Sequence, residues 1–399
     1  MNLEQYELSL LKRDMPLFRE DITEFSLQLK DAIKGSKCLI IGAAGTIGQA
    51  VTIEIFRRNP STIHAVDLSE NNMVELVRII RSTAGYSSTD FRTFSVDCGS
   101  RQFEALVQNL GPYDYVFNLS ALKHVRSEKD PYTLMRMIEV NILNTLKILN
   151  ATKGEALKKY FCVSTDKAAN PVNMMGATKR IMEIFAMRES EVQDISMARF
   201  ANVAFSDGSL LHGFTQRFLK KQPISAPYDV KRYFVTQKES GELCMMSGLL
   251  GKNREIFFPK LNSSLDLIKF SDIAQDYLAG LGYDAYLCET EEEARRKCSE
   301  LIENKKWPCY FFASDTTGEK PFEEFYTEKE NLDLDAFQSI GIIKNKPLFD
   351  EESLEKFLAD VKKIRSSHTW RKEKIVELFS SILPDFDHIE KGKNLDQRM

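Results

Sequence analysis

The sequence has little of what metal-binding and disulfide-bonded proteins need. It contains only five histidines, and its seven cysteines are scattered without a single CxxC pair. An odd number of isolated cysteines is typical of reduced thiols that pack inside a protein in a reducing compartment. We therefore expect no metal site and no disulfide framework.

Long apolar runs and a strong charge of either sign are also absent. No stretch reaches the ~18 apolar residues of a membrane span. The first residues, MNLEQYELSLLKRD, lack the positive start and apolar core of a signal peptide. The net charge of −4 gives no overall attraction to nucleic acids. These absences predict a cytoplasmic protein with no membrane span and no nucleic-acid partner.

What is present is an alternation of strand and helix patterns over the first half of the chain. Strands are expected at 37–43, 62–68, 91–97, 113–121, 159–165 and 194–204, and helices at 46–58, 70–82, 101–110 and 131–152. This order gives right-handed crossovers and a parallel sheet with both faces covered. The predicted fold class is α/β, a doubly wound parallel sheet of the Rossmann type.

The alternation loosens after residue 204, which divides the chain into four expected parts. They are an N-terminal helical arm (1–34), a nucleotide-binding domain (35–204), a smaller mixed α/β substrate lobe (205–320) and a helical C-terminal extension (321–399) with helices at 352–366 and 370–382. In the arm, Leu27, Leu29 and Ile33 are expected to dock on the body or on a partner. Its mixed charge favours this over binding to a membrane surface.

A glycine-rich turn, Gly42-Ala-Ala-Gly45-Thr46-Ile47-Gly48, follows the first strand and opens a helix. Glycine lets the backbone turn sharply and approach a pyrophosphate, while the helix N-terminus offers N–H groups and partial positive charge. The strand before it and the helix after it favour a dinucleotide site over a turn without a ligand.

Acidic residues end the next two strands. Asp67 can accept hydrogen bonds from ribose hydroxyls and would repel a 2′-phosphate, which favours NAD over NADP. His64, Arg57 and Arg58 are the competing candidates for a 2′-phosphate, but none directly follows Asp67. Asp97 either reaches the adenine amino group or caps the next helix, and the sequence leaves both open.

The fifth strand ends in Ser164-Thr165-Asp166-Lys167, and Lys179 follows on the next helix. A hydroxyl, an acid and two amines beside a nucleotide site are the groups that proton transfer needs. The alternative is a surface turn with a chance acid–base pair.

These motifs resemble a known group. The glycine spacing and Asn118-Leu-Ser-Ala-Leu-Lys-His-Val resemble the extended short-chain dehydrogenase/reductases. The stretch STDKAANPV…MGATKR, with RFANV at 199–203, GSLL at 208–211, KRYF at 231–234 and IFFPK at 256–260, resembles more closely the UDP-N-acetylglucosamine 4,6-dehydratases of the CapD-like polysaccharide biosynthesis family. The resemblance covers about residues 35–275. It implies NAD as a bound cofactor and UDP-N-acetylglucosamine or a related UDP-sugar as substrate.

The resemblance also implies roles for single residues. Lys167 would take the C5 proton, Asp166 would protonate the leaving 6-hydroxyl, and Thr165 would hydrogen-bond the C4 oxygen. Lys179 would hold the nicotinamide ribose, and Ser120 would lie beside the cofactor. A lysine base needs a lowered pKa, which burial and the neighbouring Lys179 are expected to give Lys167.

Met175 is the departure from the wider group, whose members carry Tyr at this place in a Tyr-x-x-x-Lys pair. A thioether cannot exchange protons. Asp166, through Thr165 or a water, is therefore the expected acceptor of the C4 hydroxyl proton. One branch of the resembled family carries Met here, and Met175 is placed among the substrate contacts.

The other substrate candidates come from several segments. Lys123 and His124 follow the fourth strand, with a solvated lysine and a packed histidine as the alternative. Arg232 suits a diphosphate because a guanidinium donates hydrogen bonds in pairs, and its alternative is a surface ion pair. The remaining candidates for the UDP moiety are Arg199, Asn202 and Tyr233.

Three functions remain open. The resemblance favours a 4,6-dehydratase, which oxidises the sugar at C4 with NAD, eliminates water across C5 and C6, and returns the hydride to C6. The second is a UDP-sugar epimerase on the same fold, which would not need Asp166 and Lys167. The third, favoured only by Met175, is a non-catalytic regulator that binds NAD or a nucleotide sugar. For residues 284–399 we expect packing and homo-oligomer formation.

Overall fold

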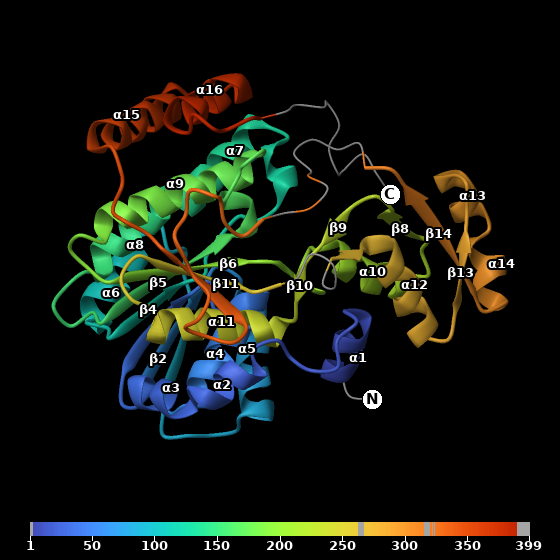
Figure 1. Cartoon of the computed structure of the whole chain (residues 1–399), viewed down its shortest axis with the longest axis horizontal. Helices are drawn as coiled ribbons and strands as arrows, with labels where there is room; N and C mark the ends of the chain where they lie inside the picture. The colour runs from blue at the N-terminus through green and yellow to red at the C-terminus, as the bar shows by residue number, and fades with distance from the viewer. Residues whose placement is uncertain (1–2, 262–266, 315–319, 321, 323, 389–399) are drawn as a thin grey trace.

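A nine-stranded sheet lies at the centre of the molecule (Figure 1), in a computed structural model that describes residues 3–261, 267–314, 320, 322 and 324–388. Its order is β15-β16-β11-β6-β5-β4-β1-β2-β3. The strands from β11 to β3 are parallel to their neighbours, whereas β16 and β15 are antiparallel. The predicted α/β class is confirmed. The strands are β1 (Lys37–Ile41), β2 (Thr62–Asp67), β3 (Asp90–Ser95), β4 (Tyr115–Asn118), β5 (Lys159–Thr165), β6 (Ile195–Phe200), β11 (Glu255–Pro259), β15 (Leu332–Asp333) and β16 (Ile340–Lys344).

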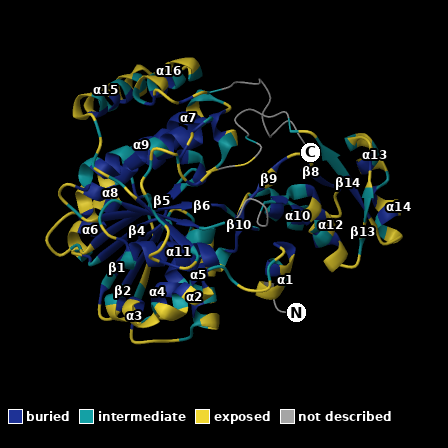
Figure 2. Cartoon of the chain, in the orientation of Figure 1, coloured by how far each residue is buried: buried dark blue, intermediate teal, exposed yellow. Residues whose placement is uncertain are grey.

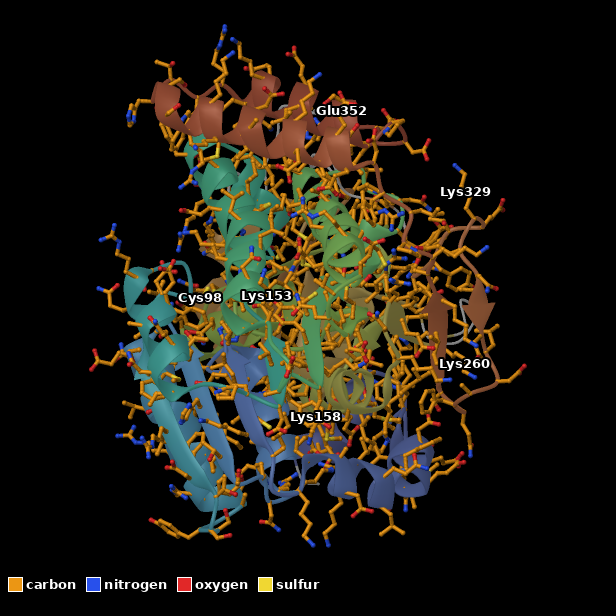
Figure 3. All side chains as sticks on the ribbon, turned by 90° about the vertical axis from the view of Figure 1, so that its left-hand side faces the viewer. Cys98, Lys153, Lys158, Lys260, Lys329 and Glu352 are labelled. Carbon is orange, nitrogen blue, oxygen red and sulfur yellow. The ribbon has the colours of Figure 1, made fainter. Side chains whose placement is uncertain are left out.

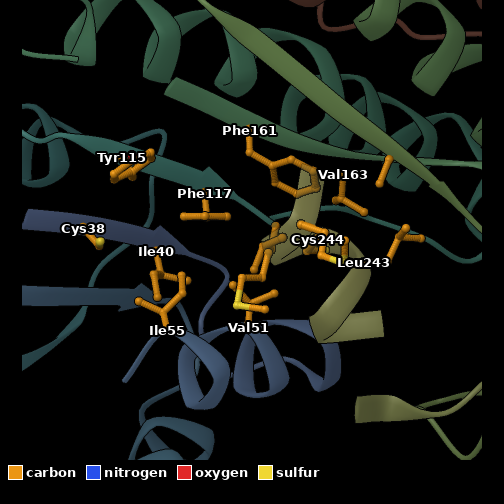
Figure 4. Packing of buried hydrophobic residues seen from close by; sticks show 14 of the residues in the cluster. Cys38, Ile40, Val51, Ile55, Tyr115, Phe117, Phe161, Val163, Leu243 and Cys244 are labelled. Atoms are coloured by element: carbon orange, nitrogen blue, oxygen red, sulfur yellow. The ribbon is translucent and has the colours of Figure 1, made fainter. Parts of the chain in front are cut away.

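Alternate side chains of the strands supply two cores, one on each face of the sheet. In β1, Cys38 and Ile40 belong to the first core and Leu39 and Ile41 to the second. Figure 4 shows part of the first core, where helices meet β1, β4 and β5. The first face is covered by α3 (Ser26–Ile33), α4 (Thr46–Phe56), α5 (Glu70–Thr83) and α11 (Gln237–Leu250), and the second by α6 (Arg101–Leu110), α8 (Asn144–Thr152) and α9 (Met174–Glu189).

A C-terminal helical hairpin adds a further layer outside the second face. Its helices, α15 (Glu351–Ser367) and α16 (Lys372–Ile382), lie over α7 (Pro131–Ile138) and α9 in Figure 1. Phe357 packs against Phe185 of α9 and Phe379 of α16 in a separate buried core. Both helices expected in the extension are confirmed, and Figure 2 shows their buried inner and exposed outer faces.

A smaller lobe continues from the sheet. Its own three-stranded sheet is parallel, in the order β13-β14-β8, and two short strand pairs connect it to the body. Trp307 is buried at its centre and stacks on Phe218. The elements are β8 (Ile224–Pro227), β13 (Asp284–Leu287), β14 (Lys306–Phe312), α10 (Leu210–Leu219), α12 (Phe270–Gly280), α13 (Glu291–Arg296) and α14 (Cys298–Glu303), with the pairs β7 (Asn202–Val203) and β10 (Phe234–Val235), and β9 (Lys231–Arg232) and β12 (Ile268–Lys269).

The N-terminal arm docks on both lobes. Leu10, at the end of α1 (Leu3–Leu10), enters the core of the small lobe. The arm continues through α2 (Arg19–Glu24) to α3, which faces the sheet. Leu29 and Ile33 of α3 are fully buried, as predicted. Leu27, also predicted to dock, is 73% exposed and points away from the body.

Three expectations about the course of the chain differ from the structure. The central sheet does not end at residue 204, because α11, β11 and β16 return to it. The strands β15 and β16 lie in the extension that was expected to be helical. The helix expected at 131–152 is interrupted by a π-helical turn, Glu139–Leu143. Residues 389–399 of the expected extension lie outside the described residues.

Charged side chains surround the buried layers. Figure 3 shows Lys329 and Glu352 toward the outer edge of the molecule. None of the described helices has the length and apolar character needed to pass through a bilayer.

Candidate functional site

The glycine-rich turn is shaped by close backbone contacts. Gly42 has a φ of +74°, and a Cβ there would lie 2.8 Å from the backbone of Leu119 and Ser120. A Cβ at Gly48 would lie 1.9 Å from the carbonyl oxygen of Gly42. Both positions therefore require glycine. The turn leads into α4, whose N-cap Gly45 offers no side-chain cap, so the first N–H groups of the helix are available to a phosphate.

Asp67 fixes the far side of this turn. Its carboxylate accepts the N–H groups of Ala44 (3.0 Å) and Ser69 (2.9 Å). The cations weighed for a 2′-phosphate are engaged elsewhere. His64 is buried against the Tyr113 hydroxyl at 2.8 Å, and burial lowers its pKa to about 4.

Arg57 and Arg58 likewise pair with Glu54, at 3.2 and 2.8 Å. Asp67 therefore ends β2, and none of His64, Arg57 and Arg58 is directed toward a 2′-phosphate beside it. This arrangement fits NAD better than NADP.

Asp97 does not cap the following helix. Its carboxylate accepts the N–H of Gly99 (2.8 Å) and pairs with Arg136 (3.1 Å), while Ser100 caps α6. The helix-cap interpretation of Asp97 is therefore wrong, and the adenine contact stays a prediction. Ser120 lies near the thiol of Cys98 at 3.7 Å.

A cavity of about 790 Å³ opens between the carboxyl ends of the central strands and the small lobe. This edge of a parallel sheet is where ligands of α/β proteins bind. Asp67, Asp97, Ser120, Arg199 and Tyr233 are the predicted site residues that do not line it. The predicted residues that it does bring together are Gly42, Gly45, Thr46, Ile47, Gly48, Lys123, His124, Thr165, Asp166, Lys167, Met175, Lys179, Asn202 and Arg232.

The predicted acid–base group forms one connected unit at the end of β5. The Thr165 hydroxyl donates to Asp166 Oδ1 at 2.7 Å, and Lys167 Nζ lies 3.1 Å from the same oxygen. The backbone N–H of Lys167 also donates to it at 2.9 Å. Asp166 is buried and Lys167 is partly exposed to the cavity. A proton can therefore pass between the hydroxyl, the carboxylate and the amine without a bridging water.

Lys179 has a lowered pKa. It is buried on α9, where Nζ donates to the Val163 carbonyl at 2.9 Å. Burial lowers its pKa to about 8. Met175 lies one turn earlier on the same helix and is also buried at the cavity wall. Gly176 lets this helix approach the turn that holds Asp166 and Lys167, because a Cβ there would lie 2.4 Å from the Lys167 carbonyl oxygen.

Lys123 and His124 form the opposite wall. Burial, reinforced by the charges of Lys123 and Arg126, lowers the pKa of His124 to about 4, so the imidazole is neutral at pH 7. Gly208 has a φ of +72°, and a Cβ there would lie 2.8 Å from His124 Nε2. The histidine therefore packs directly on the backbone that enters the small lobe.

The four UDP candidates have different fates. Arg232 and Asn202 line the cavity, and Arg232 also donates to the Lys320 carbonyl at 2.9 Å. Tyr233 is buried outside the cavity against Phe325, with 5.5 Å between the rings.

Arg199 is fully buried between Glu183 and Glu330. The predicted contact of Arg199 with UDP is therefore wrong, because its guanidinium is bound inside the protein. The contact of Tyr233 with UDP stays a prediction. An arginine that binds an internal carboxylate and one that binds a phosphate have the same signature in a sequence.

Several cavity residues were not singled out from the sequence. Ser209 had a readable signal, because a serine after Gly208 precedes an apolar helix, and it caps α10 by accepting the N–H of His212 at 3.1 Å. Phe270 and Phe312 had none, since they arrive from distant segments of the small lobe. Further polar residues of this kind include Arg126, Ser206, Arg217 and Ser225.

Sequence comparison places these features among known proteins. The profile of the family described as "Polysaccharide biosynthesis protein" matches residues 38–345. An uncharacterized membrane protein of Methanocaldococcus jannaschii is 27% identical over 78% of this chain and 86% of its own length. The probable polysaccharide biosynthesis protein EpsC of Bacillus subtilis is 28% identical over 84% of this chain, which spans about half of that relative (52%). An inverting UDP-N-acetylglucosamine 4,6-dehydratase of Campylobacter jejuni is 28% identical over 57% of this chain and 68% of its own.

Solved structures share the fold at lower identity. Pen from Bacillus thuringiensis superposes with a TM-score of 0.62 at 21% identity, covering 80% of this chain and 90% of that one. UDP-glucuronic acid 4-epimerase from Bacillus cereus, in complex with UDP-glucuronic acid and NAD, gives a TM-score of 0.51 at 18% identity, covering 72% and 89%. The fold of this chain therefore follows an architecture seen in other proteins.

Proposed function

This chain belongs to the polysaccharide biosynthesis protein family, and we propose that it is a nucleotide-sugar 4,6-dehydratase acting on UDP-N-acetylglucosamine. The observation that carries the proposal is the connected group Thr165–Asp166–Lys167 at the wall of a cavity that also holds the glycine-rich turn. The dehydratase relative from Campylobacter jejuni supports this reaction among those of the fold.

NAD fits the residues of the glycine-rich turn. Two positions of the turn admit only glycine, where a pyrophosphate would approach. Asp67 accepts the Ala44 N–H of this turn and would face the adenosine ribose, and Lys179 is buried in the cavity wall. The Bacillus cereus epimerase, whose structure contains NAD, supports the same cofactor. When bound, NAD supplies the oxidation at C4 and the matching reduction at C6.

The residues of the chain move the protons in three steps. First, the C4 hydroxyl gives its proton to the Thr165 oxygen, and Thr165 passes its own proton to Asp166 over 2.7 Å. Second, neutral Lys167 takes the C5 proton while Asp166 protonates O6, the C6–O6 bond breaks and water leaves. Third, Lys167 returns the proton to C5. Both side chains end in their starting state, and one water is lost per sugar.

This order of steps gives a use to the contact between Lys167 and Asp166 and is compatible with methionine at residue 175. Lys167 Nζ lies 3.1 Å from Asp166 Oδ1, so the two groups that act in the second step are already in contact. No step requires a phenol at residue 175, because Thr165 carries the C4 proton.

Incubation with UDP-N-acetylglucosamine in deuterated water tests the proposal. We expect a product lighter by one water, with deuterium at C5 detected by NMR. Unchanged mass with an inverted stereocentre would indicate an epimerase, and no turnover would indicate a protein that only binds the nucleotide.

Lys167→Ala tests the base directly. The variant should retain NAD but lose dehydration by about 10² to 10⁴-fold, because no other group is placed to take the C5 proton. Lys153→Ala, at the exposed end of α8, is the matched control and should keep full activity. Full activity in Lys167→Ala would rule out the assignment.

A further inference from the structure

Arg199 is the centre of a buried ion network that the proposed chemistry does not use. All five N–H groups of its guanidinium are bonded. They reach both oxygens of Glu183 (2.9 and 2.8 Å), both oxygens of Glu330 (2.8 and 2.9 Å) and the Phe325 carbonyl (2.9 Å). Arg180 adds a second guanidinium, 3.0 Å from Glu183 and 3.6 Å from Glu330. The network therefore joins α9 and β6 to a segment late in the chain.

The network ends at the catalytic strand. Glu183 Oε1 accepts the Ser164 hydroxyl at 2.6 Å, in a fully buried hydrogen bond. Ser164 directly precedes Thr165, the residue that presents its hydroxyl to Asp166. On the same helix, Lys179 Nζ is bonded to the Val163 carbonyl. The end of β5 is therefore fixed to α9 at two adjacent residues, Val163 and Ser164, directly before the acid–base group.

The late segment, residues 324–330, crosses the molecule as a strap. Glu330 accepts the N–H of Thr327 at 2.8 Å, which closes the turn of the strap around Arg199. At its other end, Glu324 accepts the side-chain N–H of Asn170 at 2.9 Å, just after the catalytic turn. The strap therefore reaches the acid–base group from both directions of the chain, through Arg199 at one end and Asn170 at the other.

Burial of so many charges is an unusual way to gain stability. Removing a guanidinium and two carboxylates from water costs more than an apolar cluster of the same size would, so such networks are weak evidence for stability. Their bidentate bonds instead fix geometry within narrow limits. Because the network contacts Ser164, its fixed geometry can hold the end of β5 in place.

We infer that Glu330 is a positioning residue for the acid–base group. Through Arg199 and Glu183 it holds Ser164, and thereby the peptide that orients Thr165 and Asp166. The kinetic part of this inference rests on the proposed dehydratase function. Misplacement of a catalytic group by a fraction of an ångström to 1 Å lowers turnover by up to about 10²-fold.

Kinetics of three variants test the inference. Glu330→Gln keeps the shape but removes the charge, Ser164→Ala removes the last bond of the chain, and Glu328→Gln, an exposed neighbour in the strap, is the matched control. We expect Glu330→Gln and Ser164→Ala each to lower kcat about tenfold with KM for the UDP-sugar unchanged. The double variant should lose no more kcat than the more damaging of the two single variants, because both residues act through one chain of contacts. Additive losses, or equal kcat in Glu330→Gln and the control, would overturn it.

Amide hydrogen exchange gives a readout that does not depend on catalysis. In Glu330→Gln and Ser164→Ala, exchange in the peptide 162–168 should accelerate about tenfold or more, while β1 and β2 stay as in the wild type. Unchanged exchange at 162–168, or acceleration throughout the protein, would contradict a positioning role. If the wild type does not turn over UDP-N-acetylglucosamine, the proposed function fails, and the exchange experiment still decides the role of Glu330.

Discussion

In the proposed reaction Thr165 carries the C4 proton, and Met175, which stands where the wider group has tyrosine, takes no part in the transfer. Thr165 holds a hydroxyl 2.7 Å from Asp166, whereas the thioether of Met175 lies buried at the cavity wall. Thr165→Val should therefore lower kcat by about 10² to 10⁴-fold, because it breaks the path of the C4 proton. Met175→Leu, which keeps the volume, should change kcat less than tenfold. Single-turnover measurement of C4 oxidation, followed by NADH absorbance, separates the two. Equal losses would mean that Met175 has a direct part in the step.

Lys179 makes stability depend on pH. Its pKa of about 8 in the folded protein lies below the ~10.4 of an unfolded lysine. Between these values the unfolded chain binds more protons, so the free energy of unfolding rises with pH by up to about 3 kcal/mol. Below pH 8 both states are protonated and the burial penalty is complete.

Lys179→Met removes that penalty in the protein without NAD. The variant should be more stable than the wild type at pH 7 by about 2 kcal/mol, after about 1 kcal/mol is lost with the bond to Val163. The difference should shrink toward pH 10. Urea unfolding between pH 7 and 10 measures it, with the exposed Lys153→Met as control. A difference that does not vary with pH would contradict the lowered pKa.

The placement of site residues that are neighbours in the sequence could be predicted. Thr165, Asp166 and Lys167 are adjacent in the chain, so the end of one strand brings them together. Arg199 was misassigned because its partner Glu330 is far away in the sequence. Nothing near Arg199 distinguishes a buried ion pair from a phosphate site.

At the scale of elements, the π-helical turn between α7 and α8 connects the two walls of the cavity. Asn141, in this turn, accepts the N–H of Leu122 at 2.9 Å and donates to the Leu122 carbonyl at 3.1 Å. It also donates to the Thr178 hydroxyl at 3.0 Å, next to Lys179. The extra residue in the turn carries this side chain between the loop of Lys123 and α9.

Asn141→Ala should lower the free energy of unfolding by about 3 kcal/mol, because it leaves the Leu122 N–H and carbonyl without their partner. Urea denaturation followed by circular dichroism measures the loss. Asn150→Ala, exposed on α8, is the matched control and should change stability by less than about 0.5 kcal/mol. A change as small as that of the control would show that the two walls do not depend on Asn141.

The π-helical turn was not predictable from the sequence. Its residues, Glu139–Leu143, continue the helical spacing of apolar positions, which predicts one unbroken helix. The interruption coincides with hydrogen bonds between Asn141 and Leu122, a residue outside the helix that the spacing of apolar positions does not report. The glycine-rich turn was predictable for the opposite reason, since backbone crowding at Gly42 and Gly48 leaves a mark in the sequence itself.

At the scale of the whole molecule, the two ends of the chain are used to complete the fold. The arm contacts both lobes, and Arg13 within it pairs with the buried Glu239 of α11 at 2.7 Å. The helical hairpin covers α7 and α9, so a homo-oligomer, which stays a prediction, would have to use other faces. The expected boundary at 204 was wrong because strand patterns reveal that strands exist but not which sheet they join.

The late position of β16 and Glu330 has a consequence for how the protein is made. The central sheet contains β15 and β16, which are translated after the strands and helices of the small lobe. A nascent chain that has not passed residue 344 lacks β16, so β11 has no partner on its outer side. The first 204 residues carry the glycine-rich turn and the acid–base group, but the outer edge of β6 stays without its strand partner until β11 is translated.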